Sequence, residues 1–269
     1  MKKLIKDGVS DVFSWANLKV EKLNEKEKVI ELIKKLYPVL TDRKLVRFGP
    51  KGDGGYLIPD DIDGIEACFS PGVGNLSGFE KDCFKNGMEV FLADKSVNSP
   101  EGNNDEFNFI KKFIGPISND SYITMDDWVL SSLNSKNSDL LLQMDIEGYE
   151  YSTILNMSNA LLKRFRIVVI EFHSLNKLWD KEFFNIVSLV FEKLLHHHTC
   201  LHIHPNNCCG ISNLKGIEIP KVAEFTFIRN NRINKREPQI NFPHLLDFDC
   251  VEEKKTIVLP KAWYSVNNN

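Results

Sequence analysis

The sequence lacks any long hydrophobic run and any strong excess of charge of one sign. No apolar stretch approaches the ~20 residues that a membrane-spanning helix needs, and the charged start Met1–Lys6 is not followed by the apolar core of a signal peptide. The 34 Lys and Arg against 37 Asp and Glu leave a formal net charge of −3, whereas proteins that follow nucleic-acid phosphates are basic. We therefore expect a cytoplasmic protein with no membrane span and no nucleic-acid partner.

Cysteine pairs at the spacing of zinc ligands are also missing. None of the six cysteines forms a CxxC-type pair, so we expect reduced and mostly structural thiols. The adjacent Cys208 and Cys209 have poor geometry for bridging each other. A metal role together with His204 is the alternative.

Internal repeats and low-complexity tracts are absent as well, and the composition is that of an ordinary globular protein. With 269 residues, 42% hydrophobic and 26% charged, a single domain can bury a sizeable core. We expect a helical cover over residues 1–42, in which residues 1–20 form one helix and a second helix is capped by Asn24 and stopped by Pro38. Residues 43–269 are expected to form the main domain with a C-terminal extension.

From residue 65 onward, short β-branched or aromatic runs alternate with helical patterns, which is typical of an α/β sheet. The expected strands are Ala67–Ser70, Val90–Ala93, Phe109–Ile114, Leu140–Met144, Ile167–Phe172, Cys200–His204 and Ala223–Ile228. The expected helices are Gly78–Asn86, Met125–Leu133, Tyr149–Leu162 and Lys181–Leu195. Leu140–Leu142 and Ile167–Ile170 are apolar throughout, which predicts central parallel strands whose carboxyl ends face a ligand.

A turn with two glycines follows the first of these strands. Gly72 and Gly74 lie in the turn, Ser70 precedes it, and Glu80 stands on the next helix. Glycines at such a turn let the backbone approach a ligand, and the free amides of the helix can bind it. The third glycine is Gly78, one position too late for the dinucleotide fingerprint, so a pyrophosphate is not specifically indicated.

Asp94 ends the neighbouring strand, 22 residues after Gly72. A carboxylate at this strand tip can accept hydrogen bonds from both hydroxyls of an adenosine ribose. The alternative is an acid in a solvated loop.

One acid pair and a histidine follow the two apolar central strands. Asp145 ends the first strand, and Glu171 and His173 lie two positions apart at the end of the second. Because adjacent strands are about 4.8 Å apart, these three side chains can converge on one reacting group. In the alternative interpretation Glu171 pairs with Arg166 or Arg229, and His173 is a hydrogen-bonded residue at the rim.

Other titratable residues near helix ends are expected to be structural. Glu147 and Glu150 fall in the first turn of a predicted helix, where the helix dipole favours acids. The run His196–His198 falls at the end of a helix, where positive charge is favoured. We expect a solvated helix end there, with a loose metal site as the alternative.

Six segments of the chain carry a family resemblance. They are RFGPKGDGGY (Arg47–Tyr56), SPGVGNLSGFE (Ser70–Glu80), ITMDDW (Ile123–Trp128), QMDIEGYE (Gln143–Glu150), VIEFH (Val169–His173) and HPNN (His204–Asn207). Together they resemble the FkbM-type methyltransferases over about residues 43–230. The resemblance implies a Rossmann-like class I methyltransferase fold: an α/β fold with a seven-stranded, mostly parallel sheet, helices on both faces and an antiparallel last strand. It also implies an S-adenosylmethionine-dependent O-methyltransferase that acts on a hydroxyl group, most often of a sugar in a surface polysaccharide or another glycan.

The same resemblance implies a set of cofactor-binding residues. They are Asp53, Gly54, Gly55, Tyr56, Ser70, Gly72, Gly74, Glu80 and Asp94. Gly72 and Gly74 are expected at the methionine part of S-adenosylmethionine and Asp94 at its ribose. The chain departs from the family pattern at Pro71, inside the turn, and at Asn75, where the family often has an acid.

Methyl transfer to a hydroxyl requires an acceptor oxygen in line with the sulfonium and removal of the hydroxyl proton. Positioning can supply up to about 7–11 kcal/mol in favourable intramolecular cases, and a general base adds about 10²- to 10⁴-fold. An imidazole suits neutral pH, so His173 is expected as the general base, with Asp145 and Glu171 orienting it or the substrate. Alternatively, the same three residues hold a divalent metal ion such as Mg²⁺, which lowers the pKa of the hydroxyl.

His204, Asn206 and Asn207 are expected to line the acceptor pocket, because imidazole and amide groups suit the recognition of hydroxyls. The alternative is an ordinary turn after Pro205. We expect a small-molecule or glycan substrate, and the sequence carries no signal for the oligomeric state.

Two other functions fit part of the pattern. A nicotinamide-dependent sugar oxidoreductase would also use the glycine turn and Asp94, but the missing fingerprint glycine and the acids after the fourth strand argue against it. A non-catalytic nucleotide-binding module would require Asp145, Glu171 and His173 to be structural.

Overall fold

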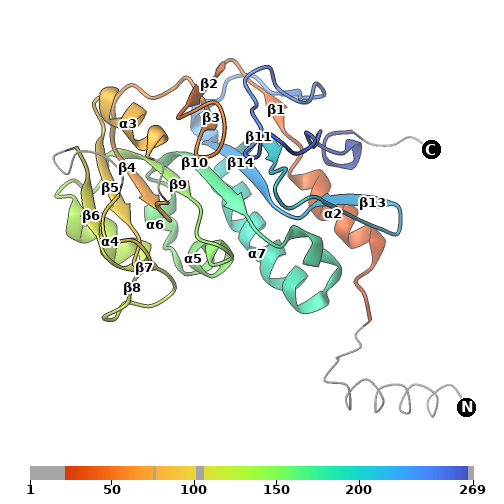
Figure 1. Ribbon diagram of the computed structural model, residues 1–269, viewed down its shortest axis with the longest axis horizontal. Helices are drawn as coiled ribbons and strands as arrows, with labels where there is room; N and C mark the ends of the chain where they lie inside the picture. Colours follow the sequence, from red (N-terminus) through yellow and green to blue (C-terminus); the bar gives the residue numbers. More distant parts are fainter. Residues whose placement is uncertain (1–21, 75–76, 101–105, 266–269) are drawn as a thin grey trace, which may run out of the picture.

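The computed structural model describes residues 22–74, 77–100 and 106–265, and a seven-stranded sheet runs through its centre (Figure 1). The strands, in their order across the sheet, are β11 (His198–Pro205), β14 (Ala223–Arg229), β10 (Phe165–Phe172), β9 (Asp139–Met144), β4 (Ile65–Pro71), β5 (Glu89–Ala93) and β6 (Asn108–Ile110). The predicted helix over residues 1–20 and Asn75 lie outside the described residues.

Strand direction confirms the predicted sheet. β4, β5, β6, β9 and β10 run parallel to one another, and the last strand, β14, runs antiparallel to both β10 and β11. All eight residues of β10 are buried, as expected for a central strand that is covered on both faces. The carboxyl ends of β4, β5, β9 and β10 therefore meet at one edge of the sheet.

Two hydrophobic cores cover the two faces of the sheet. The larger core includes Val29 of α2 (Lys26–Lys35), Trp128 of α4 (Met125–Ser132), Ile154 of α5 (Glu150–Asn156) and Phe191 of α7 (Lys181–His197). The smaller core lies under α3 (Gly78–Lys85) and the hairpin of β2 (Leu45–Phe48) and β3 (Tyr56–Pro59), where Phe79 packs against the rings of Phe48 and Tyr56. Figure 1 shows α3 and this hairpin on the opposite side of the sheet from α5 and α7. The chain is thus Rossmann-like, with helices on both faces.

The described residues form six α-helices and three 3₁₀ turns. They are α2 (Lys26–Lys35), α3 (Gly78–Lys85), α4 (Met125–Ser132), α5 (Glu150–Asn156), α6 (Asn159–Leu162) and α7 (Lys181–His197), with the 3₁₀ turns η1 (Leu175–Trp179), η2 (Asn230–Arg232) and η3 (Lys261–Trp263). Thr124, Ser158 and Asp180 each accept a hydrogen bond from an amide in the first turn of α4, α6 and α7. None of the described helices is long and apolar enough to cross a bilayer.

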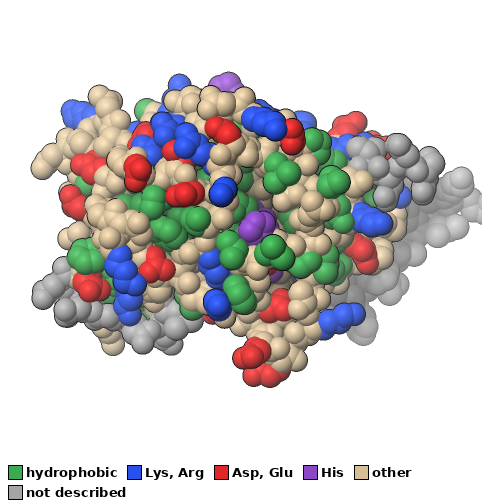
Figure 2. Space-filling model, turned by 90° about the horizontal axis from the view of Figure 1, so that it is seen from above, with side chains coloured by type: hydrophobic (Ala, Val, Ile, Leu, Met, Phe, Trp, Pro, Cys, Tyr) green, Lys and Arg blue, Asp and Glu red, His purple; other side chains and the backbone are tan. Residues whose placement is uncertain are grey.

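Four two-stranded sheets surround the central sheet. They pair β1 (Val39–Leu40) with β15 (Glu237–Pro238), β2 (Leu45–Phe48) with β3 (Tyr56–Pro59), β7 (Phe113–Ile114) with β8 (Tyr122–Ile123), and β12 (Ile211–Leu214) with β13 (Ile217–Pro220). Charged side chains of both signs are interspersed over the face in Figure 2, in keeping with the small net charge.

Three predicted elements differ from the observed ones. Asn24 does not cap the first turn of α2; its side chain bonds the amide of Glu25, because the helix starts one residue later than predicted. The helix predicted over Tyr149–Leu162 is two helices, since the chain is extended at Met157 and Ser158. The strand predicted over Phe109–Ile114 is β6 and β7, which belong to different sheets.

Candidate active site

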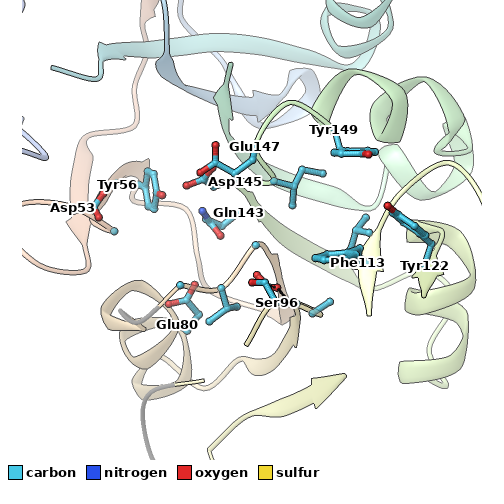
Figure 3. Close-up of a pocket in the computed structure, with 18 residues that line it drawn as sticks. Asp53, Tyr56, Glu80, Ser96, Phe113, Tyr122, Gln143, Asp145, Glu147 and Tyr149 are labelled. Atoms are coloured by element: carbon cyan, nitrogen blue, oxygen red, sulfur yellow. Dashed lines mark hydrogen bonds between the residues drawn. The ribbon is translucent and has the colours of Figure 1, made fainter. Parts of the chain in front are cut away.

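A cavity of about 630 Å³ opens at the carboxyl ends of β4, β5 and β9 (Figure 3), a size that suits a small-molecule ligand. Its described lining includes the carboxylates Asp53, Glu80, Asp94, Asp145 and Glu147 and no Lys or Arg. Because these acids face one another without basic partners in the lining, the cavity favours a ligand with positive charge.

The glycine turn forms one wall of the cavity, and its two glycines have different roles. Gly72 has a φ of +89°, and a Cβ there would stand 1.5 Å from the carbonyl oxygen of Asp145. Gly72 therefore lets β4 and β9 approach closely. A Cβ on Gly74 would meet no described atom within 4 Å, so packing does not require glycine at that position.

Ser70 and Glu80 form a buried hydrogen bond beside the glycine turn. The hydroxyl oxygen of Ser70 lies 2.6 Å from Glu80 Oε1 and 2.6 Å from Gln143 Oε1. Burial raises the pKa of Glu80, and the hydrogen bond to Ser70 opposes that rise. Glu80 and Gln143 line the cavity, whereas Ser70 is not among the lining residues.

Asp94 lies at the end of β5 and lines the cavity, as the ribose prediction requires. Its Oδ1 accepts hydrogen bonds of 2.6 Å from both the amide and the hydroxyl of Ser96. These bonds hold the carboxylate in place and leave Oδ2 without a bond from Ser96.

The loop before β3 supplies the opposite wall. Asp53, Gly54 and Tyr56 line the cavity, and Gly55 does not. A Cβ on Gly55 would stand 2.1 Å from Pro50 O, which makes this glycine a packing requirement of the loop. Burial, together with the neighbouring acids, raises the pKa of Tyr56 well above its usual range.

Aromatic side chains form a further part of the lining that sequence reasoning missed. Phe113, Tyr122 and Tyr149 lie on the side away from Tyr56 (Figure 3), and the Tyr122 and Tyr149 ring centroids are 6.3 Å apart. They come from β7, β8 and the loop after β9, and no spacing in the sequence connects them.

Asp145, Glu171 and His173 do converge. His173 Nε2 lies 3.7 Å from Glu171 Oε1 and 3.9 Å from Asp145 Oδ1. One ligand atom from each of the three residues lies within 4.8 Å of the others. Asp145 lines the cavity, while Glu171 and His173 lie behind it and are not among the lining residues.

Burial and the neighbouring charges shift the pKa values of the residues in this cluster. Burial raises the pKa of Asp145 to about 7, with Glu147 adding to the effect and His173 opposing it. Burial and the charge of Asp145 raise the pKa of Glu171 well above its usual value. Burial alone would lower the pKa of His173, but its hydrogen bond to Glu150 and the nearby acids raise the pKa overall.

Glu147 lies outside the first turn of α5, where it was predicted, whereas Glu150 lies in that turn as predicted but also contacts His173. Glu147 precedes α5, has a φ of 54°, and places Oε2 3.4 Å from His173 Nε2. Glu150 is fully buried, and its Oε1 lies 3.1 Å from His173 Nδ1. The predicted role at the helix end involves only neighbouring backbone amides. The positions of these two acids in the sequence therefore did not indicate a contact with His173, which follows β10.

The alternative pairing of Glu171 with arginine was also wrong. Arg166 and Arg229 both bind Asp139, at the opposite edge of the sheet. Glu171 instead accepts a hydrogen bond of 3.2 Å from the Asn206 amide.

His204, Asn206 and Asn207 are buried and are not among the residues that line the cavity. Asn207 donates to the carbonyls of Val251 and Lys254, and His204 Nδ1 lies 3.5 Å from Asp247 Oδ2. Residues 247–254 of the C-terminal extension therefore occupy the space beside these side chains, and Asn206 reaches the site only through Glu171.

One further expectation changes with the structure. His198 is buried, and its Nε2 contacts the carbonyl of Phe165 at 2.7 Å, so the His196–His198 run is not wholly a solvated helix end. Burial lowers the pKa of His198 to about 4. All six cysteines are free thiols, with Cys68, Cys83 and Cys200 buried as predicted.

A Rossmann-like sheet with an acidic ligand-sized cavity at its carboxyl edge defines the class of α/β proteins that bind a small cofactor at the strand ends. Residues 70–198 match the family model of the Methyltransferase FkbM domain. This match confirms the resemblance to the FkbM-type methyltransferases that the sequence segments carry.

Comparisons with solved structures and with curated proteins are less informative. One similar solved structure is described as "Conversion of a Disulfide Bond into a Thioacetal Group during Echinomycin Biosynthesis", with 12% identity, 61% of this chain and 76% of that chain covered, and a TM-score of 0.29. Another is spermidine synthase from Thermotoga maritima, with 7% identity, 71% of each chain covered and a TM-score of 0.31. Likeness at this level carries no weight for function. No curated protein matches the chain.

Proposed function

We propose that this protein is an S-adenosylmethionine-dependent O-methyltransferase, and that its acceptor is a hydroxyl group of a sugar in a surface polysaccharide or another glycan. The observation that carries the proposal is the acidic cavity next to Asp145, Glu171 and His173, in a chain whose residues 70–198 match the FkbM methyltransferase model. We also propose that it acts in the cytoplasm on a small-molecule or glycan substrate.

The residues of the cavity suit S-adenosylmethionine. Asp94 at the end of β5 offers a carboxylate to the ribose hydroxyls, and Gly74 leaves open space for close approach of a ligand. The acidic lining suits a cationic sulfonium. When bound, S-adenosylmethionine supplies an electrophilic methyl group.

We assign proton removal to His173. Its Nε2 is turned toward Asp145, Glu147 and Glu171 and would accept the proton of the acceptor hydroxyl when the methyl group passes from sulfur to oxygen and S-adenosylhomocysteine leaves. Asp145, at the cavity wall, orients the acceptor. Most of the rate enhancement then comes from placing the acceptor oxygen in line with the methyl group.

A second mechanism uses the same residues as metal ligands. Asp145, Glu171 and His173 bring two carboxylates and an imidazole within 4.8 Å of one another, a donor set that suits a hard divalent ion such as Mg²⁺. Such an ion would lower the pKa of the acceptor hydroxyl. Methyl transfer that survives exhaustive chelation would exclude this mechanism and leave the general-base mechanism.

Calorimetry separates the proposed function from its rivals. S-adenosylmethionine should bind wild-type protein and bind Asp94→Asn at least about tenfold more weakly, a loss of about 1.4 kcal/mol. Glu89→Gln, an exposed change at the other end of β5, serves as the control. Binding of NAD without binding of S-adenosylmethionine would favour an oxidoreductase, and binding of neither would favour a non-catalytic module.

The acceptor can be identified with a labelled methyl donor. Hydroxylated glycans and free sugars incubated with the protein and labelled S-adenosylmethionine should include one that gains label. Because the described lining has no Lys or Arg, we expect neutral acceptors to be labelled before phosphorylated ones. Label on nitrogen or carbon instead of oxygen would correct the proposed specificity.

A further inference from the structure

Glu150 combines complete burial with contacts outside its own helix. It stands at the start of α5, and the residue is 0% exposed. Its Oε1 lies 3.1 Å from the amide nitrogen of Ile146, 3.0 Å from that of Gly148 and 3.1 Å from His173 Nδ1. An acid that only complemented the helix dipole would need none of these contacts.

These contacts determine which nitrogen of His173 carries a proton. Glu150 Oε1 accepts hydrogen bonds from two backbone amides, so the His173 nitrogen that faces the same oxygen is a donor to it. The neutral ring therefore has its proton on Nδ1 and its lone pair on Nε2. Nε2 is the atom that faces Glu147, Glu171 and Asp145, at 3.4, 3.7 and 3.9 Å.

Glu150 also fixes the loop that carries the cavity wall. Glu147 and Gly148 in this loop have φ values of 54° and 101°, in the left-handed region. The two amides bound by Glu150 lie on either side of Glu147. The carboxylate thus holds both the imidazole and the segment between Asp145 and Tyr149, although it does not line the cavity.

We propose that Glu150 is a positioning residue for the methyl transfer proposed above: it holds His173 as the Nδ1–H tautomer, with Nε2 toward Asp145 and Glu171, and it fixes the loop after β9. The inference rests on the proposed function for its role in the reaction. The tautomer itself is independent of that function. A histidine ligand or base whose second nitrogen is held by a carboxylate is a recurrent arrangement, and loss of such a partner costs about 10- to 100-fold.

The first measurement reads the tautomer. Full-length protein labelled with ¹⁵N-histidine should show, at a pH where the ring of His173 is neutral, a protonated Nδ1 and an unprotonated Nε2. In Glu150→Ala we expect a mixture of tautomers or the Nε2–H form, and in Glu150→Gln, whose amide oxygen still accepts from Nδ1, the Nδ1–H form. An Nε2–H ring in wild type, or an unchanged ring in Glu150→Ala, would overturn the inference.

The second measurement reads the reaction. Glu150→Ala should lower kcat about 10- to 100-fold with little change in the Kd for S-adenosylmethionine, and Glu150→Gln should recover part of the loss. Glu27→Gln, an exposed acid in the first turn of α2, is the matched control. Unchanged kcat in Glu150→Ala would refute the positioning role while the proposed function stands. If wild type transfers no methyl group and binds no S-adenosylmethionine, the proposed function fails, and the tautomer measurement still decides what Glu150 holds.

Discussion

At the scale of single residues, the proposed role of His173 is the one that kinetic measurements test most directly. Its ring lies within 4 Å of four carboxylates, from Asp145, Glu147, Glu150 and Glu171. Nearby carboxylates favour the protonated ring, and His173 can act as a general base only when the ring is neutral at the working pH. The pKa of His173 is therefore the quantity to measure.

Replacing His173 by alanine should lower kcat about 10²- to 10⁴-fold, because the acceptor proton loses its base. Since the nearby acids raise the pKa of His173, the wild-type rate should rise with pH through a value above the ordinary 6.5. Rate measurements between pH 6 and 10 check both points. His196→Ala, at the far end of α7, is the control, and full activity in His173→Ala would remove the base mechanism.

Gly72 and Gly74 form a matched pair for separating packing from ligand contact. Gly72→Ala should cost at least ~2 kcal/mol of unfolding free energy, because the new Cβ would overlap the Asp145 carbonyl at a φ of +89°. Gly74→Ala should change stability by less than ~0.5 kcal/mol and weaken S-adenosylmethionine binding. Urea unfolding and calorimetry measure the two effects. Equal stability losses would show that both glycines serve packing.

At the scale of elements, three strands are joined by one carboxylate at the edge away from the cavity. Asp139 on β9 accepts from Arg166 on β10 at 2.8 Å and from Arg229 on β14 at 2.5 Å. Arg166 also donates to the carbonyls of Asp61 and Asp63, so it ties the segment before β4 to the same edge. This network links β9 to β10, the two strands whose other ends bring Asp145 beside Glu171.

Asp139→Asn should reduce the unfolding free energy by about 2–3 kcal/mol, because it leaves two largely buried guanidinium groups short of a counter-charge. Glu237→Gln removes an exposed partner of Lys235 and should change stability by less than ~0.5 kcal/mol. Denaturant unfolding of both variants measures the difference. The prediction fails if the two losses are similar.

At the scale of the whole molecule, the C-terminal extension is held against the sheet by histidines. Asp247 accepts from His202 Nε2 at 2.8 Å and lies 3.5 Å from His204 Nδ1. Burial opposes protonation of His204, but its hydrogen bond to Asp247 and the charge of Glu224 raise its pKa to about 9. The extension therefore depends on a buried ion pair.

This pair predicts a pH dependence of stability with a definite sign. A raised folded-state pKa adds stability that is fully present below the unfolded value of about 6.5 and is lost as the pH rises through about 9. The difference in unfolding free energy between wild type and Asp247→Asn should thus be of order 2 kcal/mol at pH 6 and shrink by pH 9.5. Urea unfolding across this range measures it. A difference that grows with pH would contradict the pair.

The sequence by itself determined the sheet, because a run such as Ile167–Ile170 is apolar throughout and must be covered on both faces. It also located Asp94 and the Asp145, Glu171 and His173 cluster, since parallel strands bring their carboxyl ends to one edge. Only the tertiary structure decided the rest. Glu150, the aromatic wall and the C-terminal contacts of His204 depend on side chains from distant segments meeting, and a linear pattern does not encode those distances.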